Sequence, residues 1–181
     1  MAQREYNTGF CNFHYRVVGW NSSIRAKRFP GAVRLSFKPQ TQERKVLVRT
    51  DSGLLLSESL AKHEASREAT LEIVSIPKSF LTDVLGWTET AEGILIEGQH
   101  PDTHVTLYYE TDNGDNPIRH KLYDVVFGRP SFDVSTIADT PSADIRKLEL
   151  TVNPNNGSYQ EKLAKADAVD ISVYNNWFKS V

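Results

Sequence analysis

Apolar and polar residues alternate with a period of two along most of this chain, and this pattern constrains the fold more than any other feature. In the segment 66–76, for example, Ala69, Leu71 and Ile73 are separated by polar residues. Because successive side chains of a strand point to opposite faces, each such segment predicts a strand with one buried face. The other segments of this kind are 13–18, 32–37, 44–58, 104–110, 120–128, 131–137 and 146–152. The sequence therefore predicts a mainly β fold of eight to ten strands, a β-sandwich or barrel.

One segment has helical spacing instead. In "IPKSFLTDVLGW", residues 76–87, the apolar residues recur on one face of a helix; they are Ile76, Phe80, Leu81, Val84 and Leu85. Ser75 is expected to cap this helix, Pro77 fits its first turn and Gly86 can end it. A short helix with one apolar stripe is expected to flank the sheet and to cover one of its faces or edges.

Composition excludes several classes of protein. Hydrophobic residues make up 39% and charged residues 24% of 181 residues, which indicates neither disorder nor a membrane span. Cys11 is the single cysteine, so the chain has no internal disulfide and is expected to fold in a reducing cytoplasm.

Charge is distributed unevenly along the chain. Residues 1–50 carry a net charge of +8 and residues 51–181 a net charge of −10. Such asymmetry can indicate a nucleic-acid-binding arm or two complementary surfaces that meet when identical subunits associate. Because the basic residues are spread along turns and strands, complementary surfaces are favoured, with Arg25, Lys27 and Arg28 as candidate interface residues.

The segment 40–67 does not fit a simple half-buried hairpin. Its apolar residues form two consecutive triplets, so both faces of a hairpin would carry apolar groups; they are Val46, Leu47, Val48, Leu54, Leu55 and Leu56. A hairpin in water normally keeps one face polar, and apolar residues on both faces indicate either an interaction surface or buried core strands.

No motif in the sequence predicts catalysis. His100, Asp102 and His104 could hold a metal in principle, but a turn before a strand explains them better. The segment 112–115 lacks the final glutamate of a calcium loop. Cys11 and His14, three apart on a predicted strand, should point to opposite faces. We therefore expect no enzymatic activity, no cofactor and no metal.

The order of elements resembles a known family. The quoted helix, the strand "GILIEG", the segment "LYDVVFGRPSFDVSTI" and the following "TPSADIRKLELTVNP" occur in the order found in major tail proteins of long, flexible-tailed phages of Gram-positive bacteria. The segment "NFHYRVVGW" is similar to the family's opening strand. The resemblance covers Asn12 to Pro154 and contains no catalytic signature. The basic first fifty residues and the chain after Asn155 depart from the family pattern.

This resemblance implies a phage tail-tube-like fold and a structural role in the virion. Subunits of the family self-assemble into hexameric rings that stack into a hollow tail tube, through which DNA passes during ejection without specific binding. Residues 1–154 would form the tube domain, 40–67 an assembly hairpin that reaches a neighbour, and 155–181 a C-terminal extension or arm. The implied partners are other copies of the chain and the tail-tip, tape-measure and tail-terminator proteins, with no membrane.

A conduit for DNA should have an acidic or neutral wall, because a basic wall would hold the phosphates. The candidate lumen carboxylates are Glu68, Glu72, Asp124, Asp133 and Glu149.

Two questions remain open from the sequence. Val169, Ile171 and Val173 alternate like a strand, which could add to a neighbouring subunit or pack back on its own domain. The alternative functions are a carbohydrate- or receptor-binding β-sandwich and the inner-tube protein of a contractile injection system. The first would need exposed aromatic side chains, for which the candidates are Tyr108, Tyr109, Tyr123, Trp20, Trp87 and Trp177.

Overall fold

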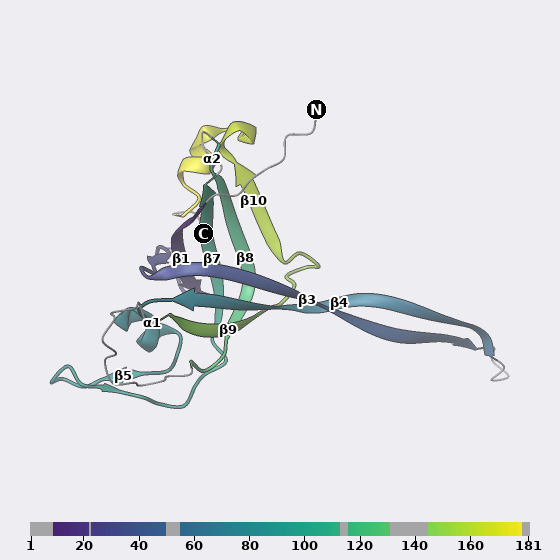
Figure 1. Ribbon diagram of the computed structural model, residues 1–181, viewed down its shortest axis with the longest axis horizontal. Helices are drawn as coiled ribbons and strands as arrows, with labels where there is room; N and C mark the ends of the chain where they lie inside the picture. The colour runs from purple at the N-terminus through teal and green to yellow at the C-terminus, as the bar shows by residue number, and fades with distance from the viewer. Residues whose placement is uncertain (1–8, 22, 50–54, 113–115, 131–144, 179–181) are drawn as a thin grey trace, which may run out of the picture.

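The computed structural model describes residues 9–21, 23–49, 55–112, 116–130 and 145–178, and it describes only the backbone of 39–49 and 55–65. Figure 1 shows a twisted sheet from which one long hairpin projects. The strands are β1 (Gly9–Val17), β2 (Lys27–Arg28), β3 (Ala32–Arg49), β4 (Leu55–Ile73), β5 (Thr88–Glu89), β6 (Leu95–Ile96), β7 (His104–Asp112), β8 (Ile118–Phe127), β9 (Arg146–Val152) and β10 (Gln160–Ala164). The helices are α1 (Lys78–Asp83), α2 (Ile171–Asn175) and a 3₁₀ turn, η1 (Lys165–Asp167). The predicted mainly β fold with a short flanking helix and a long hairpin is confirmed.

Eight of these strands form one antiparallel sheet, in the order β2-β1-β7-β8-β9-β4-β3, with β10 also paired to β8. One edge of β8 is shared by two strands: β10 pairs with residues 118–122 and β9 with residues 125–127. The division falls at Asp124, whose φ is 45° and whose carbonyl accepts a hydrogen bond from the Asn153 amide. The sheet therefore branches at β8, and the β9-β4-β3 wing folds across the face of β1 and β7 (Figure 1). β5 and β6 form a separate small hairpin.

The core fills the space inside this folded sheet, and the alternating pattern determines which residues enter it. Ala69, Leu71 and Ile73 of β4 are buried, as are the equivalent residues of β9, which are Leu148, Leu150 and Val152. The predicted faces of both strands are confirmed.

Helix α1 closes one end of the core through Phe80. The Phe80 ring meets the rings of Tyr15, Phe29 and Phe127 edge to face, with centroids 5.0, 4.8 and 5.0 Å away. Phe80, Val84 and Leu85 are all buried, so the apolar stripe predicted for this segment is confirmed. The helix thus covers an open end of the sheet with an aromatic side chain.

The ends of α1 differ in part from the prediction. Pro77, with extended backbone, is the N-cap and no side chain caps the helix, so the expected cap by Ser75 is wrong. Pro77 therefore precedes the first turn instead of lying in it as expected, and proline disfavours helical backbone in Ile76 before it. The helix ends at Asp83 with Val84 as its C-cap, which is earlier than the predicted end at Gly86. Gly86, with φ of 76°, lies in the turn that follows, where the Trp87 amide donates to the Leu81 carbonyl.

A bulge in β1 corrects a second expectation. Cys11 lies opposite Glu110 and His14 opposite Tyr108, so one extra residue separates them and both lie on the same face. Asn12, with φ of 50°, forms this bulge. The expectation that Cys11 and His14 point to opposite faces is therefore wrong. Burial and the nearby Glu110 raise the pKa of the Cys11 thiol, which favours the unreactive protonated form.

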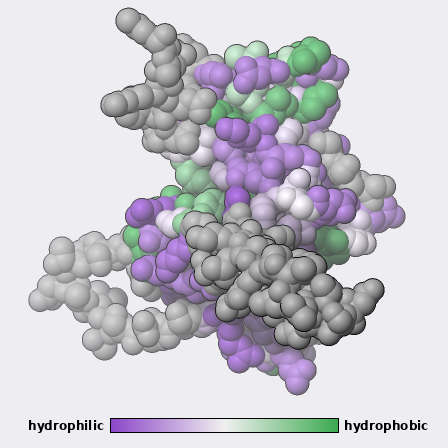
Figure 2. Space-filling model, turned by 90° about the vertical axis from the view of Figure 1, so that its right-hand side faces the viewer, coloured by the Kyte–Doolittle hydropathy of each residue, from purple (hydrophilic) through white to green (hydrophobic). Residues whose placement is uncertain are grey.

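The C-terminal segment packs back on its own sheet. β10 pairs with β8, and Tyr174 of α2 is buried. The expected strand around Val169 and Val173 is wrong, because Asp170 accepts a hydrogen bond from the Ser172 amide at 2.8 Å and starts α2 instead. Val169, Ile171 and Val173 remain exposed, and Figure 2 shows hydrophobic side chains at the upper end of the molecule, where Figure 1 places α2.

Candidate functional site

The most prominent feature outside the folded body is the distal part of the β3–β4 hairpin. β4 pairs with β9 only from Arg67 to Ile73, whereas its pairing with β3 continues to Arg49 and Leu55. Residues 41–49 and 55–64 therefore form a two-stranded ribbon, which projects from the body in Figure 1. Nine residues of strand extend over about 30 Å. A register shift between Pro39 and Thr41 marks the point where the ribbon leaves the sheet.

Most of the predicted assembly residues lie on this ribbon. Val46, Leu47 and Val48 stand opposite Ser59, Glu58 and Ser57, and Leu55 stands opposite Arg49. Since strand residues alternate between faces, Val46 and Val48 share one face of the ribbon and Leu47 lies on the other. Leu56 also lies on β4, and Leu54 lies outside the described residues. Apolar residues thus occupy both faces of a ribbon that has no third strand among those described.

Three of the candidate lumen carboxylates share one surface, the outer face of β3, β4 and β9. Glu68 lies opposite Thr151 and Glu72 opposite Lys147, while Glu149 accepts a hydrogen bond from the Thr70 hydroxyl at 3.0 Å. The same face carries cations at Arg34, Lys38 and Lys147, by their register with β4. This surface therefore alternates in charge and is close to neutral.

The other two candidate carboxylates lie elsewhere. Asp124 occupies the branch point of β8, and its carboxylate contacts Nδ1 of His104, which is half exposed. Asp133 lies outside the described residues. Asp124 therefore has a role inside the fold.

The three candidate interface cations lie in two different environments. Arg25 and Arg28 are exposed at the start and end of the short segment around β2. Lys27 instead forms an ion pair with Asp83 at 2.6 Å and lies 4.9 Å from the Trp20 ring. Asp83 also accepts a hydrogen bond from the buried Tyr15 hydroxyl at 2.8 Å. Lys27 thus ties β2 to α1, and only Arg25 and Arg28 are placed to meet a partner.

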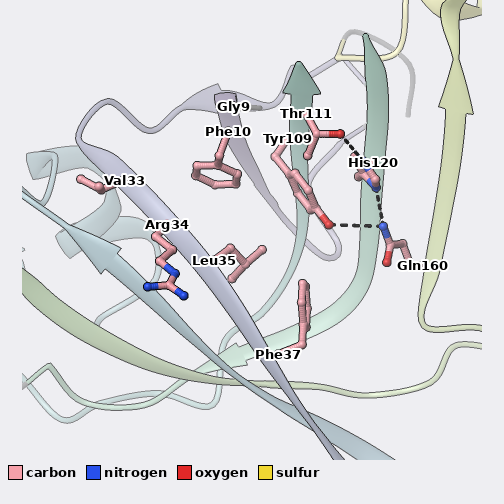
Figure 3. A pocket seen from close by; sticks show the side chains of 10 residues that line it. All are labelled: Gly9, Phe10, Val33, Arg34, Leu35, Phe37, Tyr109, Thr111, His120 and Gln160. Atoms are coloured by element: carbon pink, nitrogen blue, oxygen red, sulfur yellow. Dashed lines mark hydrogen bonds between the residues drawn. The ribbon is translucent and has the colours of Figure 1, made fainter. Parts of the chain in front are cut away.

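A groove with a polar cluster at one end was not anticipated from the sequence. It has a volume of about 500 Å³ and lies between the first part of β3 and strands β7, β8 and β10. Figure 3 shows its apolar wall and its polar end; the apolar residues are Phe10, Val33, Leu35 and Phe37. At the polar end, the ring of His120 stacks on Tyr109 and contacts Thr111 and Gln160. These residues come from distant parts of the chain, and no local motif links them.

The described part of the chain offers no metal site among its candidate ligands. Among the described residues, no three His, Cys, Asp or Glu side chains are grouped so as to hold a metal. Nε2 of His100 is buried without a hydrogen-bond partner there. No helix in the described part of the chain has the length and apolarity needed to cross a membrane.

The aromatic residues that a sugar-binding surface would need are largely used inside the fold. Tyr108 and Tyr109 are buried, and Trp20 and Trp87 pack against the core. The Trp177 indole donates to the His120 carbonyl at 3.3 Å.

Comparison with known proteins finds partial structural likeness only. No protein-family model and no curated protein matches the chain. A chain in the 6-fold symmetrised baseplate of the anti-feeding prophage shares 16% identity at a TM-score of 0.42, over 90% of this chain and 97% of that one. A chain in the extended PVC sheath–tube complex of an extracellular contractile injection system shares 14% identity at a TM-score of 0.41, over 84% of this chain and 88% of that one. A chain in the tube-terminating cap of the anti-feeding prophage shares 11% sequence identity at a TM-score of 0.38, over 90% of this chain and 93% of that one. Scores at this level establish neither a shared fold nor a shared function for this chain.

Proposed function

We propose that this protein is a structural, non-catalytic subunit of a phage-type tail tube. Copies of the chain assemble into rings, hexameric in the family that the sequence resembles, and the rings stack into a hollow tube for DNA. The tail-tip, tape-measure and tail-terminator proteins are the expected partners. The virion tail is the expected location.

The projecting ribbon carries this proposal. An isolated two-stranded hairpin is at best marginally stable in water, and it needs further strands or a packed face. Here apolar residues occupy both faces of the ribbon formed by 41–49 and 55–64, so packing against one face alone would leave the apolar residues of the other face in water. Burying a Val or Leu side chain contributes about 1.5–3 kcal/mol, so these residues can contribute on the order of 10 kcal/mol when a neighbour covers the ribbon.

The position of the ribbon also favours open-ended assembly. The ribbon projects from one side of the body (Figure 1), and in this proposal the body of a neighbour receives it, which is a different surface from the ribbon itself. Contacts between two different surfaces repeat head to tail, and they generate rings when the rotation closes. A subunit of this shape suits rings better than it suits a two-fold dimer.

The charge-alternating face of β3, β4 and β9 is the surface we assign to the lumen. Its carboxylates at Glu68, Glu72 and Glu149 are balanced by Arg34, Lys38 and Lys147. A nearly neutral wall does not retain duplex DNA, because retention needs many uncompensated cations on phosphates. The sugar-binding alternative is weaker, since its candidate aromatic residues other than Tyr123 are engaged within the fold.

The test is electron microscopy of the purified protein at increasing concentration, with a variant in which residues 42–63 are replaced by a short Gly-Ser turn. This variant keeps the β4–β9 pairing, so the body should fold, which circular dichroism can check. We expect rings or tubes from the intact chain and none from the variant.

Point variants sharpen the result. Leu47→Asp with Val48→Asp places charge on both faces of the ribbon, and Ile94→Asp is the matched control on the exposed β6 hairpin. Loss of assembly in the first and not in the second supports the proposal. Monodisperse protein at every concentration, or assembly that survives loss of the ribbon, contradicts it.

A further inference from the structure

His120 occupies an unusual position on β8. It is the one polar residue outside the tyrosines that the described part of the chain buries, at 8% exposure. Its ring lies flat on the Tyr109 ring, with centroids 4.5 Å apart and planes within 3°. Both ring nitrogens are engaged: Nε2 lies 2.9 Å from the Thr111 hydroxyl and Nδ1 lies 2.5 Å from Nε2 of Gln160 (Figure 3).

These contacts suit only a neutral ring. The Gln160 amide donates to Nδ1, so the ring proton is on Nε2 and points to the Thr111 oxygen. A second proton on Nδ1 would meet the Gln160 NH₂ group, which is also a donor. Lys162 of β10 is the cross-strand neighbour of His120, so its charge opposes added positive charge on the ring. Burial, with a further contribution from Lys162, lowers the pKa of His120 from 6.5 to about 4.

The contacts of His120 also hold the end of the chain. Residues 159–178, which we term the C-terminal strap, comprise β10, η1 and α2. Gln160 is the first residue of β10, and its register partner is Leu122. Near the other end of the strap, the Trp177 indole donates to the His120 carbonyl. His120 therefore touches the strap at both ends.

We propose that His120 is a pH-sensitive latch for the C-terminal strap. Protonation of its ring at Nδ1 breaks the hydrogen bond from Gln160 and releases β10 from the edge of β8. Release frees the backbone of residues 118–122, which is then available to pair with another strand. The groove beside β3 opens at the same time, since Gln160 lines it. This inference concerns the folded chain and does not depend on the proposed function.

The direction of the pH dependence follows from the lowered pKa of His120. Above pH 6.5 the ring is neutral whether the strap is closed or open, so the latch has its full effect. As the pH falls below 6.5, the exposed ring of the open form binds a proton while the closed form does not, and this continues down to about pH 4. The open population should therefore rise by about 20-fold between pH 7 and pH 5.

Hydrogen–deuterium exchange of the intact protein at pH 7, 6 and 5 tests the latch. We expect the protection factors of the β10 amides, corrected for intrinsic exchange rates, to fall by about 20-fold, while those of β7 and β9 stay constant. Protection of β10 that does not change with pH overturns the proposal. Such a result would follow if the Gln160 amide rotated to offer its oxygen to the protonated ring. A fall shared equally by β7 and β9 would report global unfolding and would also overturn it.

Two variants separate a latch from a merely structural residue. Gln160→Glu places a carboxylate against Nδ1, so a protonated ring gains an acceptor and β10 should stay protected at pH 5. His120→Phe keeps the stacking on Tyr109 but cannot titrate, so β10 protection should be lower at pH 7 and should not change further at pH 5. His104→Asn, on the exposed pair with Asp124, is the matched control and should retain the pH dependence of the natural chain. Unchanged pH dependence in Gln160→Glu or His120→Phe refutes the latch.

Discussion

Phe80 should contribute more to the stability of the body than any other residue of its helix. The ring is fully buried and meets three other aromatic rings edge to face at 4.8–5.0 Å. Replacing a buried Phe by Ala costs about 3–5 kcal/mol, and each aromatic pair adds about 0.5–1.5 kcal/mol beyond buried area. We expect Phe80→Ala to lie at the upper end, about 5 kcal/mol, because three pairs are lost together.

Phe80→Leu gives a second measurement that does not require the weakest variant to fold. Leucine keeps most of the apolar contact and loses the aromatic pairs, so we expect a cost of about 2 kcal/mol. With an m-value of about 2 kcal/mol per M in urea, the midpoint should fall by about 1 M.

Urea unfolding followed by circular dichroism measures both variants. The control is Ile94→Ala, since Ile94 is 59% exposed on the β6 hairpin and its loss should cost less than about 0.5 kcal/mol. A midpoint for Phe80→Leu equal to that of the control would refute the central role of this ring.

Three further predictions concern single sites and use the same unfolding assay. Gly86→Ala should cost about 3 kcal/mol, because φ is 76° and the added Cβ would lie 2.3 Å from the backbone oxygen of Gln99. The control, Gly19→Ala, has open space around the added Cβ and should cost about 1 kcal/mol. Equal costs for the two variants would contradict this prediction. Asp83→Ala should cost about 1–3 kcal/mol, because it removes the hydrogen-bond acceptor of the Tyr15 hydroxyl. The control, Glu89→Ala, removes one partner of an exposed ion pair and should change stability by no more than about 0.5 kcal/mol. A larger cost for Glu89→Ala would refute the stabilising role of Asp83. Arg119→Ala should cost about 2–4 kcal/mol, because it removes the ion-pair partner of the largely buried Glu110 at 2.9 Å and a cation that lies over two rings of the strap. A cost below about 1 kcal/mol would count against that role.

Local patterns predicted much of the fold because they report burial directly. The alternation along β4 and β9 placed Ala69, Leu71, Leu148 and Leu150 in the core, where they lie. The spacing around Phe80 predicted an apolar helix stripe for the same reason. The double-faced triplets of the ribbon also came from the sequence, because apolar residues on both faces are visible without knowing the partner.

Other features depend on backbone geometry or on distant residues. The bulge at Asn12 changed which residues share a face of β1, and no local signal announces one extra residue in a strand. Around Val173, period-two spacing indicated a strand, but the hydrogen bond at Asp170 starts a helix. The cluster around His120 joins β7, β8 and β10, and only long-range strand pairing brings Gln160 to it.

The branching of the sheet at β8 has a mechanical consequence. Among the strands described, the ribbon and the β9-β4-β3 wing are joined to the rest of the sheet by backbone hydrogen bonds along the short stretch 124–128 of the chain. A pull on the ribbon, about 30 Å long, would act as a torque on this short junction. Under load, this torque would fall on the junction and on the core residues that pack between the wing and the strands β1 and β7. In an assembly joined by such ribbons, load would pass from one body to the next through this junction.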